Sequence, residues 1–130
     1  MQKRSITMLG TALTALTMIG LARPIASAQA QTPQQYVVVY GEFRPDRFSI
    51  QQGTQILLYL THLANQSAGV VNFASYTEIQ RANFFSLIEL WQDAATYTAF
   101  LNSSNTQKAL GELQPFLIAP LDERDGNLVE

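Results

Sequence analysis

The sequence has no cysteine and a single histidine among its 130 residues. Without thiols the chain can form neither disulfide bonds nor thiolate nucleophiles, so burial of apolar surface has to stabilise it. One imidazole and no thiol cannot build a nitrogen–sulfur metal site. The same scarcity gives no basis for a Ser/His/Asp catalytic arrangement. We therefore expect neither a bound metal nor a disulfide framework.

The N-terminal segment has the features of a secretory signal peptide. Lys3 and Arg4 precede an uncharged, mostly apolar run over residues 6–21. Such a run is short for a membrane span, which needs about 20 strongly apolar residues. We predict a signal peptide over residues 1–28, with an uncleaved membrane anchor as the alternative.

Small residues two positions apart form two overlapping cleavage patterns, which end at Ala28 and Ala30. Cleavage at either site would leave a short polar leader, and we expect residues 29–35 to be disordered. The pattern is typical of bacterial export. It predicts a periplasmic or secreted protein that is not held at a membrane after cleavage.

Basic residues are also few. The signal peptide contains three of the eight basic residues, Lys3, Arg4 and Arg23, and none of the ten acidic ones, so its removal leaves a net charge of −5. Nucleic acids and anionic membrane surfaces both bind basic faces. The composition therefore argues against either as a partner.

Hydrophobic periodicity divides the rest of the chain into strands and helices. Runs of branched and aromatic residues predict strands, and apolar residues at helical spacing behind Ser49 and Asp93 predict helices. The β-α-β-β-α-β order, with the second helical part interrupted, is the ferredoxin-like pattern of an α+β domain with an antiparallel sheet. We place this domain at residues 36–124 and a polar tail at 125–130. The predicted strands cover 36–43, 69–79, 84–91 and 116–121, and the predicted helices cover 49–66, 94–101 and 104–113.

The predicted strand at 84–91 combines a carboxylate and an indole with an otherwise apolar run. Glu89 and Trp91 are two residues apart and therefore share one face of the sheet. We expect the helices to cover the other face, which leaves Glu89 and Trp91 on an open face with Asn72 and Tyr76. An exposed aromatic face needs a ligand or a second sheet, so a cavity in a two-fold dimer is the functional interpretation. The alternative is that Glu89 points to solvent at a sheet edge.

His62 lies on the predicted helix at 49–66, well round from its buried stripe. An imidazole titrates near neutral pH, so histidine is a common acid–base group. Without partners in the sequence, the residue is either a surface histidine or an acid–base group that reaches the cavity.

Three segments carry a family resemblance. Residues 83–95 are Asn-Phe-Phe-Ser-Leu-Ile-Glu-Leu-Trp-Gln-Asp-Ala-Ala, residues 113–117 are Leu-Gln-Pro-Phe-Leu, and residues 119–124 are Ala-Pro-Leu-Asp-Glu-Arg. With its Glu-x-Trp and Asp-x-Ala spacings inside a β-α-β-β-α-β order, the sequence resembles the antibiotic biosynthesis monooxygenase family, and in particular its quinol monooxygenase-like members. The resemblance covers about residues 36–124.

The resemblance implies a homodimer with a dimeric α+β barrel fold. It also implies an enzyme that oxidises a small aromatic substrate, a quinol or polyphenol, with O2 and without metal, flavin or haem. A phenolate can pass an electron to O2 itself, so the protein need only deprotonate, orient and desolvate it. Glu89 or His62 would take the proton as the catalytic residue. The substrate-binding residues would be Trp91, Tyr76, Asn72 and Tyr97.

The sequence departs from this family at three positions where relatives often carry histidine, namely Phe84, Phe100 and Asn105. Haem-degrading relatives use a helix histidine as the iron ligand, so these residues argue against haem. The missing histidines also leave a second class of function open. That alternative is a non-catalytic periplasmic protein that binds aromatic ligands on the same dimeric barrel.

Overall fold

The computed structural model describes residues 32–127 and residue 129. The predicted signal peptide and residues 29–31 of the predicted leader lie outside the described residues. The described elements follow the expected order, and β1 already begins at Gln35. The elements are β1 (Gln35–Glu42), α2 (Arg47–Asn65), β2 (Val70–Thr77), β3 (Phe84–Trp91), α3 (Ala94–Asn102), α4 (Ser104–Leu113), the 3-10 helix η1 (Gln114–Phe116) and β4 (Asp122–Asn127).

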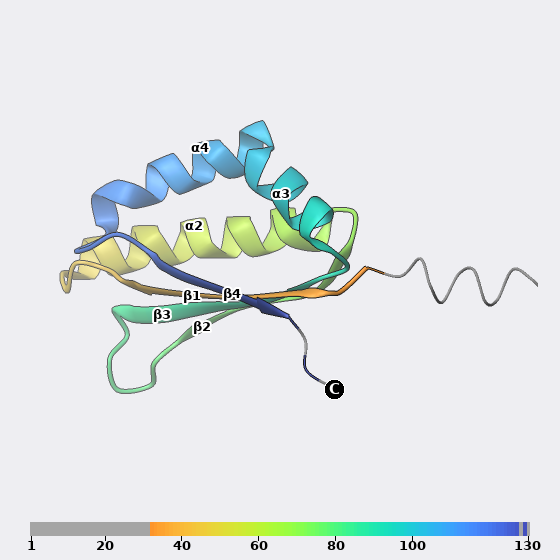
Figure 1. The fold of residues 1–130 in the computed structure, drawn as a ribbon. Coiled ribbons are helices and arrows are strands. Elements are labelled where there is room, and N and C mark those ends of the chain that lie inside the picture. The colour runs from red at the N-terminus through yellow and green to blue at the C-terminus, as the bar shows by residue number, and fades with distance from the viewer. Residues whose placement is uncertain (1–31, 128, 130) are drawn as a thin grey trace, which may run out of the picture. The chain divides into compact units, whose positions relative to one another are not determined.

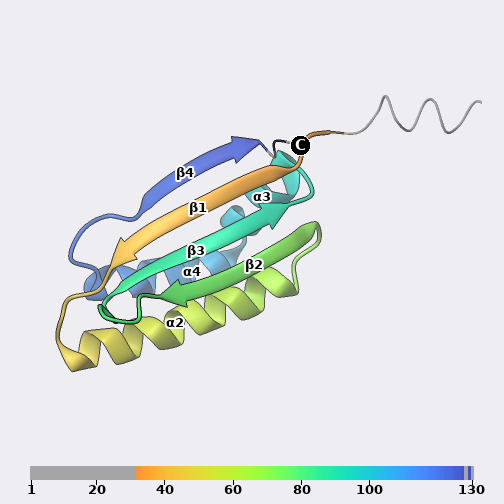
Figure 2. The same cartoon turned by 90° about the horizontal axis from the view of Figure 1, so that it is seen from below.

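The four strands form one antiparallel sheet in the order β2-β3-β1-β4 (Figure 2). Helices α2, α3 and α4 lie on one face of this sheet, and the other face carries no helix from the described residues (Figure 1). The predicted ferredoxin-like α+β fold is thereby confirmed, with its second helical part divided in two. Within residues 32–127, no helix combines the length and the apolar character that crossing a membrane requires.

Helix α2 begins two residues before the predicted start. The backbone N–H of Ser49 donates to Oδ1 of Asp46 and its hydroxyl donates to Oδ2, both at 2.8 Å. These bonds hold the pKa of Asp46 below its ordinary value. Asp46 is therefore the N-cap, and Ser49, which we predicted to be the cap, lies in the first turn. Two good capping residues stand three positions apart, and the earlier one starts the helix.

Two glycines make room for a stacked pair of phenylalanine rings. The ring centroids of Phe43 and Phe85 lie 4.5 Å apart. A Cβ atom on Gly53 would come within 2.1 Å of the Phe43 ring, and one on Gly41 within 2.2 Å of the Phe85 ring. Glycine in a helix costs roughly 1 kcal/mol relative to alanine. Here that loss permits the close contact between α2 and the end of β1.

Side-chain caps produce the interruption between α3 and α4. The backbone N–H of Thr96 donates to Oδ1 of Asp93 at 2.8 Å, which starts α3. The N–H of Ser103 donates to the carbonyl of Phe100 at 3.2 Å, and its hydroxyl oxygen accepts from the N–H of Thr106 at 3.3 Å. Ser103 thus ends one helix and begins the next. The new helix direction brings Thr106 into the core, where it is 1% exposed.

The last strand differs from the prediction. The apolar segment 116–121 makes one isolated bridge, between Leu117 and Phe43, and the polar segment Asp122–Asn127 forms β4 instead. Pro120 has no N–H to donate to a sheet. Because β4 is an edge strand paired only with β1, backbone hydrogen bonds hold it without apolar side chains. It continues past the predicted domain end at residue 124.

The burial pattern corrects which face of the sheet the helices cover. Alternate residues of β3 are buried, namely Phe85, Leu87, Glu89 and Trp91. The Trp91 ring packs against Phe100 of α3, with centroids 5.0 Å apart, so this face meets the helices. Our expectation that Glu89 and Trp91 lie on the open face is therefore wrong. Both alternating sets of β3 are mostly apolar, so periodicity alone could not decide between them.

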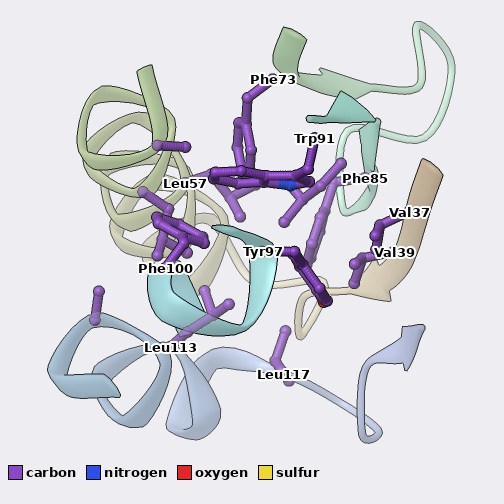
Figure 3. Packing of buried hydrophobic residues seen from close by; sticks show 14 of the residues in the cluster. Val37, Val39, Leu57, Phe73, Phe85, Trp91, Tyr97, Phe100, Leu113 and Leu117 are labelled. Atoms are coloured by element: carbon purple, nitrogen blue, oxygen red, sulfur yellow. The ribbon is translucent and has the colours of Figure 1, made fainter. Parts of the chain in front are cut away.

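An aromatic cluster joins the sheet to α3. Trp91 is fully buried, and its ring centroid lies 5.9 Å from that of Tyr97. Phe100 packs edge-on against Phe73 of β2 at 5.9 Å. Figure 3 shows Trp91 among Phe73, Phe85, Tyr97 and Phe100. The cluster forms one wall of the site described next.

Candidate functional site

A cavity of about 80 Å³ lies between the sheet and the helix layer. Its lining is mostly apolar, and residues from β1, β2, β3 and all three α-helices contribute to it. The partly exposed lining residues Leu101, Leu110 and Leu121 mark the side that opens to solvent. The polar lining residues are Glu89, Tyr97, Thr106 and Glu123.

Glu89 is the buried acid of this site, with 3% of its surface exposed. The indole N–H of Trp91 donates to its Oε1 at 2.9 Å. Burial raises the pKa of Glu89 to about 7; the hydrogen bond from Trp91 opposes the rise, and the negative charges of Glu123 and Asp125 add to it. A carboxyl group with a near-neutral pKa can both take and give a proton at physiological pH.

The second oxygen of Glu89 faces the cavity. Only Oε1 accepts a hydrogen bond from the described residues. Among those residues, no fully buried side-chain oxygen or nitrogen lacks a partner. Oε2 is therefore not fully buried, and Glu89 lines the cavity, so the cavity is where solvent meets this oxygen. One oxygen fixes the side chain and the other is available for chemistry.

Tyr97 forms the second polar group of the site. Its hydroxyl donates to Oε1 of Glu123, which joins α3 to the edge strand β4. Burial raises the pKa of Tyr97 far above its ordinary value, and the hydrogen bond to Glu123 and the nearby negative charges act in the same direction. Tyr97 therefore stays protonated and acts as a hydrogen-bond donor.

Trp91 has a different place from the one that we predicted. It is fully buried, it does not line the cavity, and its indole N–H donates to Glu89. It therefore cannot stack directly on a ligand in this arrangement. Its effect on the site is to hold Glu89 in position and to keep the pKa of that carboxyl from rising further.

Three other predicted residues lie away from the cavity. Asn72 and Tyr76 are exposed on the open face of the sheet, and His62 is exposed on α2. A register shift after Val70 places Phe73, instead of Asn72, on the same face as Glu89. The prediction that all of these residues share one cavity is wrong. The structure brings together Glu89, Trp91 and Tyr97, of which two face the cavity.

Several lining residues were not predicted. Phe73, Phe100 and Thr106 line the cavity, but in the sequence they look like ordinary core or capping residues. Glu123 lies after Pro120 in a polar segment near the C-terminus, so the sequence suggested a solvent-exposed tail. The alternation of acidic residues with Arg124 in β4 was the one available signal, because it places Glu123 and Asp125 on a common face.

The site offers proton transfer and an apolar enclosure. Within the part of the chain that the structure describes, no three His, Cys, Asp or Glu side chains could hold one metal ion. Three aromatic side chains, Phe73, Tyr97 and Phe100, line the cavity with Glu89 and suit a planar ligand. The fold and the site together define a class: a small ferredoxin-like α+β protein with one near-neutral carboxylic acid in an apolar cavity.

Solved structures of other proteins share this fold. The sequence matches no protein-family model and no curated protein. An antibiotic biosynthesis monooxygenase has a TM-score of 0.68 at 12% identity, over 74% of this chain and 99% of the other. A variant of SnoaB, a cofactor-independent oxygenase from Streptomyces nogalater, has a TM-score of 0.61 at 11% identity, over 76% and 94%. Rv0793 from Mycobacterium tuberculosis has a TM-score of 0.68 at 11% identity, over 75% and 96%.

At these identities the likeness shows a shared fold. The resemblance inferred from the sequence is confirmed at that level, because the structural neighbours include antibiotic biosynthesis monooxygenases. A fold hosts many activities, so function has to be argued from the site. The second protomer of the expected barrel stays a prediction.

Proposed function

We propose that this protein is a cofactor-independent monooxygenase that oxidises a small quinol or related polyphenol with O2. The observation that carries the proposal is Glu89, a buried carboxyl with a pKa of about 7 and one oxygen directed into an apolar cavity. SnoaB, a named cofactor-independent oxygenase of the same fold, supports the assignment.

Glu89 acts as the general base. It takes the proton of a phenolic hydroxyl, whose ordinary pKa is about 10. The resulting phenolate passes one electron to O2, and the two radicals combine to form a carbon–oxygen bond. Glu89 returns its proton to the distal oxygen of this peroxide. The O–O bond then breaks, and the distal O–H leaves as water with the hydrogen of the ring carbon that gained oxygen, so that this carbon becomes a carbonyl. For hydroquinone the products are hydroxybenzoquinone and water, so the ring loses four electrons and O2 gains four.

The surroundings of Glu89 favour this chemistry. The apolar walls exclude water, which keeps the carboxyl pKa near neutrality and leaves the phenolate poorly solvated and electron-rich. Trp91 fixes the carboxyl through its N–H bond at 2.9 Å. The base is therefore held in position before the substrate arrives. Less entropy is then lost when the reacting groups are brought together.

Oxygen uptake tests the proposal. The wild-type protein should consume O2 with hydroquinone or a related diol above the rate of spontaneous oxidation, without an added cofactor. Glu89→Gln should lower this rate by about 100-fold or more, because the general base is lost. Glu112→Gln, on the exposed surface of α4, removes a charge away from the site and should keep the wild-type rate. Equal rates in the two variants would overturn the role of Glu89.

The second candidate is a non-catalytic protein that binds aromatic ligands. It is favoured by the lack of a histidine among the described residues that line the cavity, since His62 lies exposed on α2. This candidate predicts saturable quenching of Trp91, the chain's only tryptophan, without any O2 uptake.

We further propose that two copies pair through the open sheet face. Tyr36, Tyr40 and Tyr76 are 38%, 48% and 54% exposed there. Ile88 and Leu90 on the same face are partly exposed. Contiguous apolar surface of this kind is uncommon on monomers, and a second sheet would cover it. The signal-like N-terminal segment supports export to the periplasm or beyond, which cell fractionation would test.

A further inference from the structure

The charge around the cavity is one-sided. Glu89, Glu123 and Asp125 all lie on the helix-facing side of the sheet, since Val37 pairs with both Glu89 and Asp125 and Val39 pairs with Glu123. No lysine, arginine or histidine of the described residues lines the cavity. Any ligand therefore meets negative charge that no lining cation offsets.

The cation nearest to Glu123 in the sequence points away from the cavity. Arg124 lies over the ring of Tyr40, with its guanidinium carbon 5.2 Å from the ring centroid. It also pairs with Asp122 at 2.8 Å. Both contacts are on the open face, so Arg124 does not neutralise Glu123.

The two carboxylates that line the cavity lie at different depths. Glu89 is buried, whereas Glu123 is exposed on the edge strand at the mouth. Their strands are separated by β1, and neighbouring strands lie about 4.8 Å apart, so the two backbones are about 10 Å apart or more. The two side chains reach toward the same cavity. A ligand in this cavity can therefore meet Glu89 at the buried end and Glu123 at the mouth.

The volume of the cavity limits the ligand to one ring. The cavity measures about 80 Å³. An engineered apolar cavity of about 150 Å³ in another protein takes up benzene. This cavity is smaller than that one, so even a single ring would extend to the open side beside Leu101, Leu110 and Leu121, and a second fused ring has no room.

We propose, on the basis of the function argued above, that the site selects single-ring phenols with a neutral or cationic substituent and rejects phenols with a carboxylate. The phenolic hydroxyl lies at Glu89, and the substituent lies at the mouth beside Glu123. Glu123 is the specificity-determining residue, because a carboxylate there meets a like charge and an ammonium group meets an opposite one.

Binding to the mature protein tests the proposal, with calorimetry and Trp91 fluorescence as two readouts. The probes share a 4-hydroxyphenyl group: tyramine is cationic, tyrosol is neutral and 4-hydroxyphenylacetate is anionic. At low ionic strength, tyramine should bind at least about tenfold more tightly than 4-hydroxyphenylacetate, with tyrosol between them. A fused two-ring phenol, 2-naphthol, should bind more weakly than tyrosol.

Two variants test the source of the selectivity. Glu123→Gln keeps an oxygen that can accept the Tyr97 hydroxyl, and it should lower the ratio of tyramine to 4-hydroxyphenylacetate affinity several-fold. Asp125→Asn removes an exposed charge on the same face and should lower the ratio less. Glu112→Gln removes a charge remote from the cavity and should keep the wild-type ratio. Circular dichroism checks that each variant is folded.

The outcomes separate this proposal from the enzymatic one. Equal or tighter binding of 4-hydroxyphenylacetate, an unchanged ratio in folded Glu123→Gln, or no saturable binding of any probe would each overturn it. Selective binding without O2 uptake would support the site specificity and overturn the oxygenase function.

Discussion

Replacing Glu89 by glutamine removes a buried acid and keeps its hydrogen bond. The amide oxygen of glutamine can accept the indole N–H of Trp91, which now lies 2.9 Å from Oε1. The two side chains are also nearly equal in volume. The difference in the free energy of unfolding between this variant and the wild type therefore measures the cost of ionising the Glu89 carboxyl inside the folded protein.

The magnitude follows from the two pKa values. The carboxyl has a pKa of about 7 in the folded protein and 4.5 when unperturbed. Between these values the folded state holds a proton that the unfolded chain has released, so the free energy of unfolding falls as the pH rises. At about 1.36 kcal/mol for each pKa unit, the full loss is about 3 kcal/mol. This loss of stability is complete just above pH 7, where Glu89 is ionised in both states. Below pH 4.5 there is no loss, because Glu89 is then protonated in both the folded and the unfolded protein.

Urea unfolding from about pH 4 to about pH 8 measures this effect. Trp91 is fully buried and is the only tryptophan, so its emission reports unfolding. Glu89→Gln should match the wild type near pH 4 and exceed it by about 3 kcal/mol near pH 8. Subtracting the two curves removes groups such as Asp46, whose lowered pKa gives the opposite slope.

Glu112→Gln provides the control, because this exposed residue should leave the wild-type curve unchanged at every pH. If the free energies of unfolding of Glu89→Gln and the wild type depend on pH in the same way, then ionising Glu89 costs no more in the folded protein than in the unfolded chain. The near-neutral pKa, and with it the argument for a general base, would then be refuted.

Three further substitutions probe other parts of the structure. Trp91→Phe removes the donor that lowers the pKa of Glu89, so the pH midpoint of O2 uptake should move upward; a midpoint that stays or falls would contradict the assigned role. Gly53→Ala should lower the free energy of unfolding by about 1–3 kcal/mol despite its better helix propensity, since the new Cβ meets the Phe43 ring; a more stable variant in urea would count against this packing. Ile88→Asp places a charge in the open face and should yield monomers in sedimentation experiments with unchanged circular dichroism, whereas a persistent dimer would exclude that interface.

Much of the fold could be predicted from local patterns. The strand at 84–91 was expected with the bounds that β3 has, and Asp93 caps α3 as expected. These elements have strong signals because branched and aromatic residues favour strands and an aspartate side chain satisfies free backbone donors. The strand at 116–121 failed because hydropathy cannot detect a polar edge strand such as β4, which is held by backbone hydrogen bonds.

The site was harder to predict than the fold. Alternation correctly placed Glu89 and Trp91 on one face, but only the docking of the helices decides which face of a doubly apolar strand is covered. The register shift after Val70 turned Asn72 to the open face, and the sequence carries no mark of such a shift. Glu123 reaches the cavity only through the pairing of β4 with β1, which is a contact between distant parts of the chain.

The edge strand also bears on how a ligand enters. All six residues of β4 are exposed, and its only strand neighbour is β1. Detaching β4 from β1 uncovers little apolar surface. We therefore expect the free energy of this local opening to be among the lowest in the protein. Its amide hydrogens should exchange with solvent sooner than those of β3, which lies inside the sheet. Glu123 belongs to this strand, so fraying of β4 widens the entrance to the cavity. A ligand bound to Glu123 would therefore slow hydrogen exchange along the whole of β4, although the ligand contacts only one of its residues.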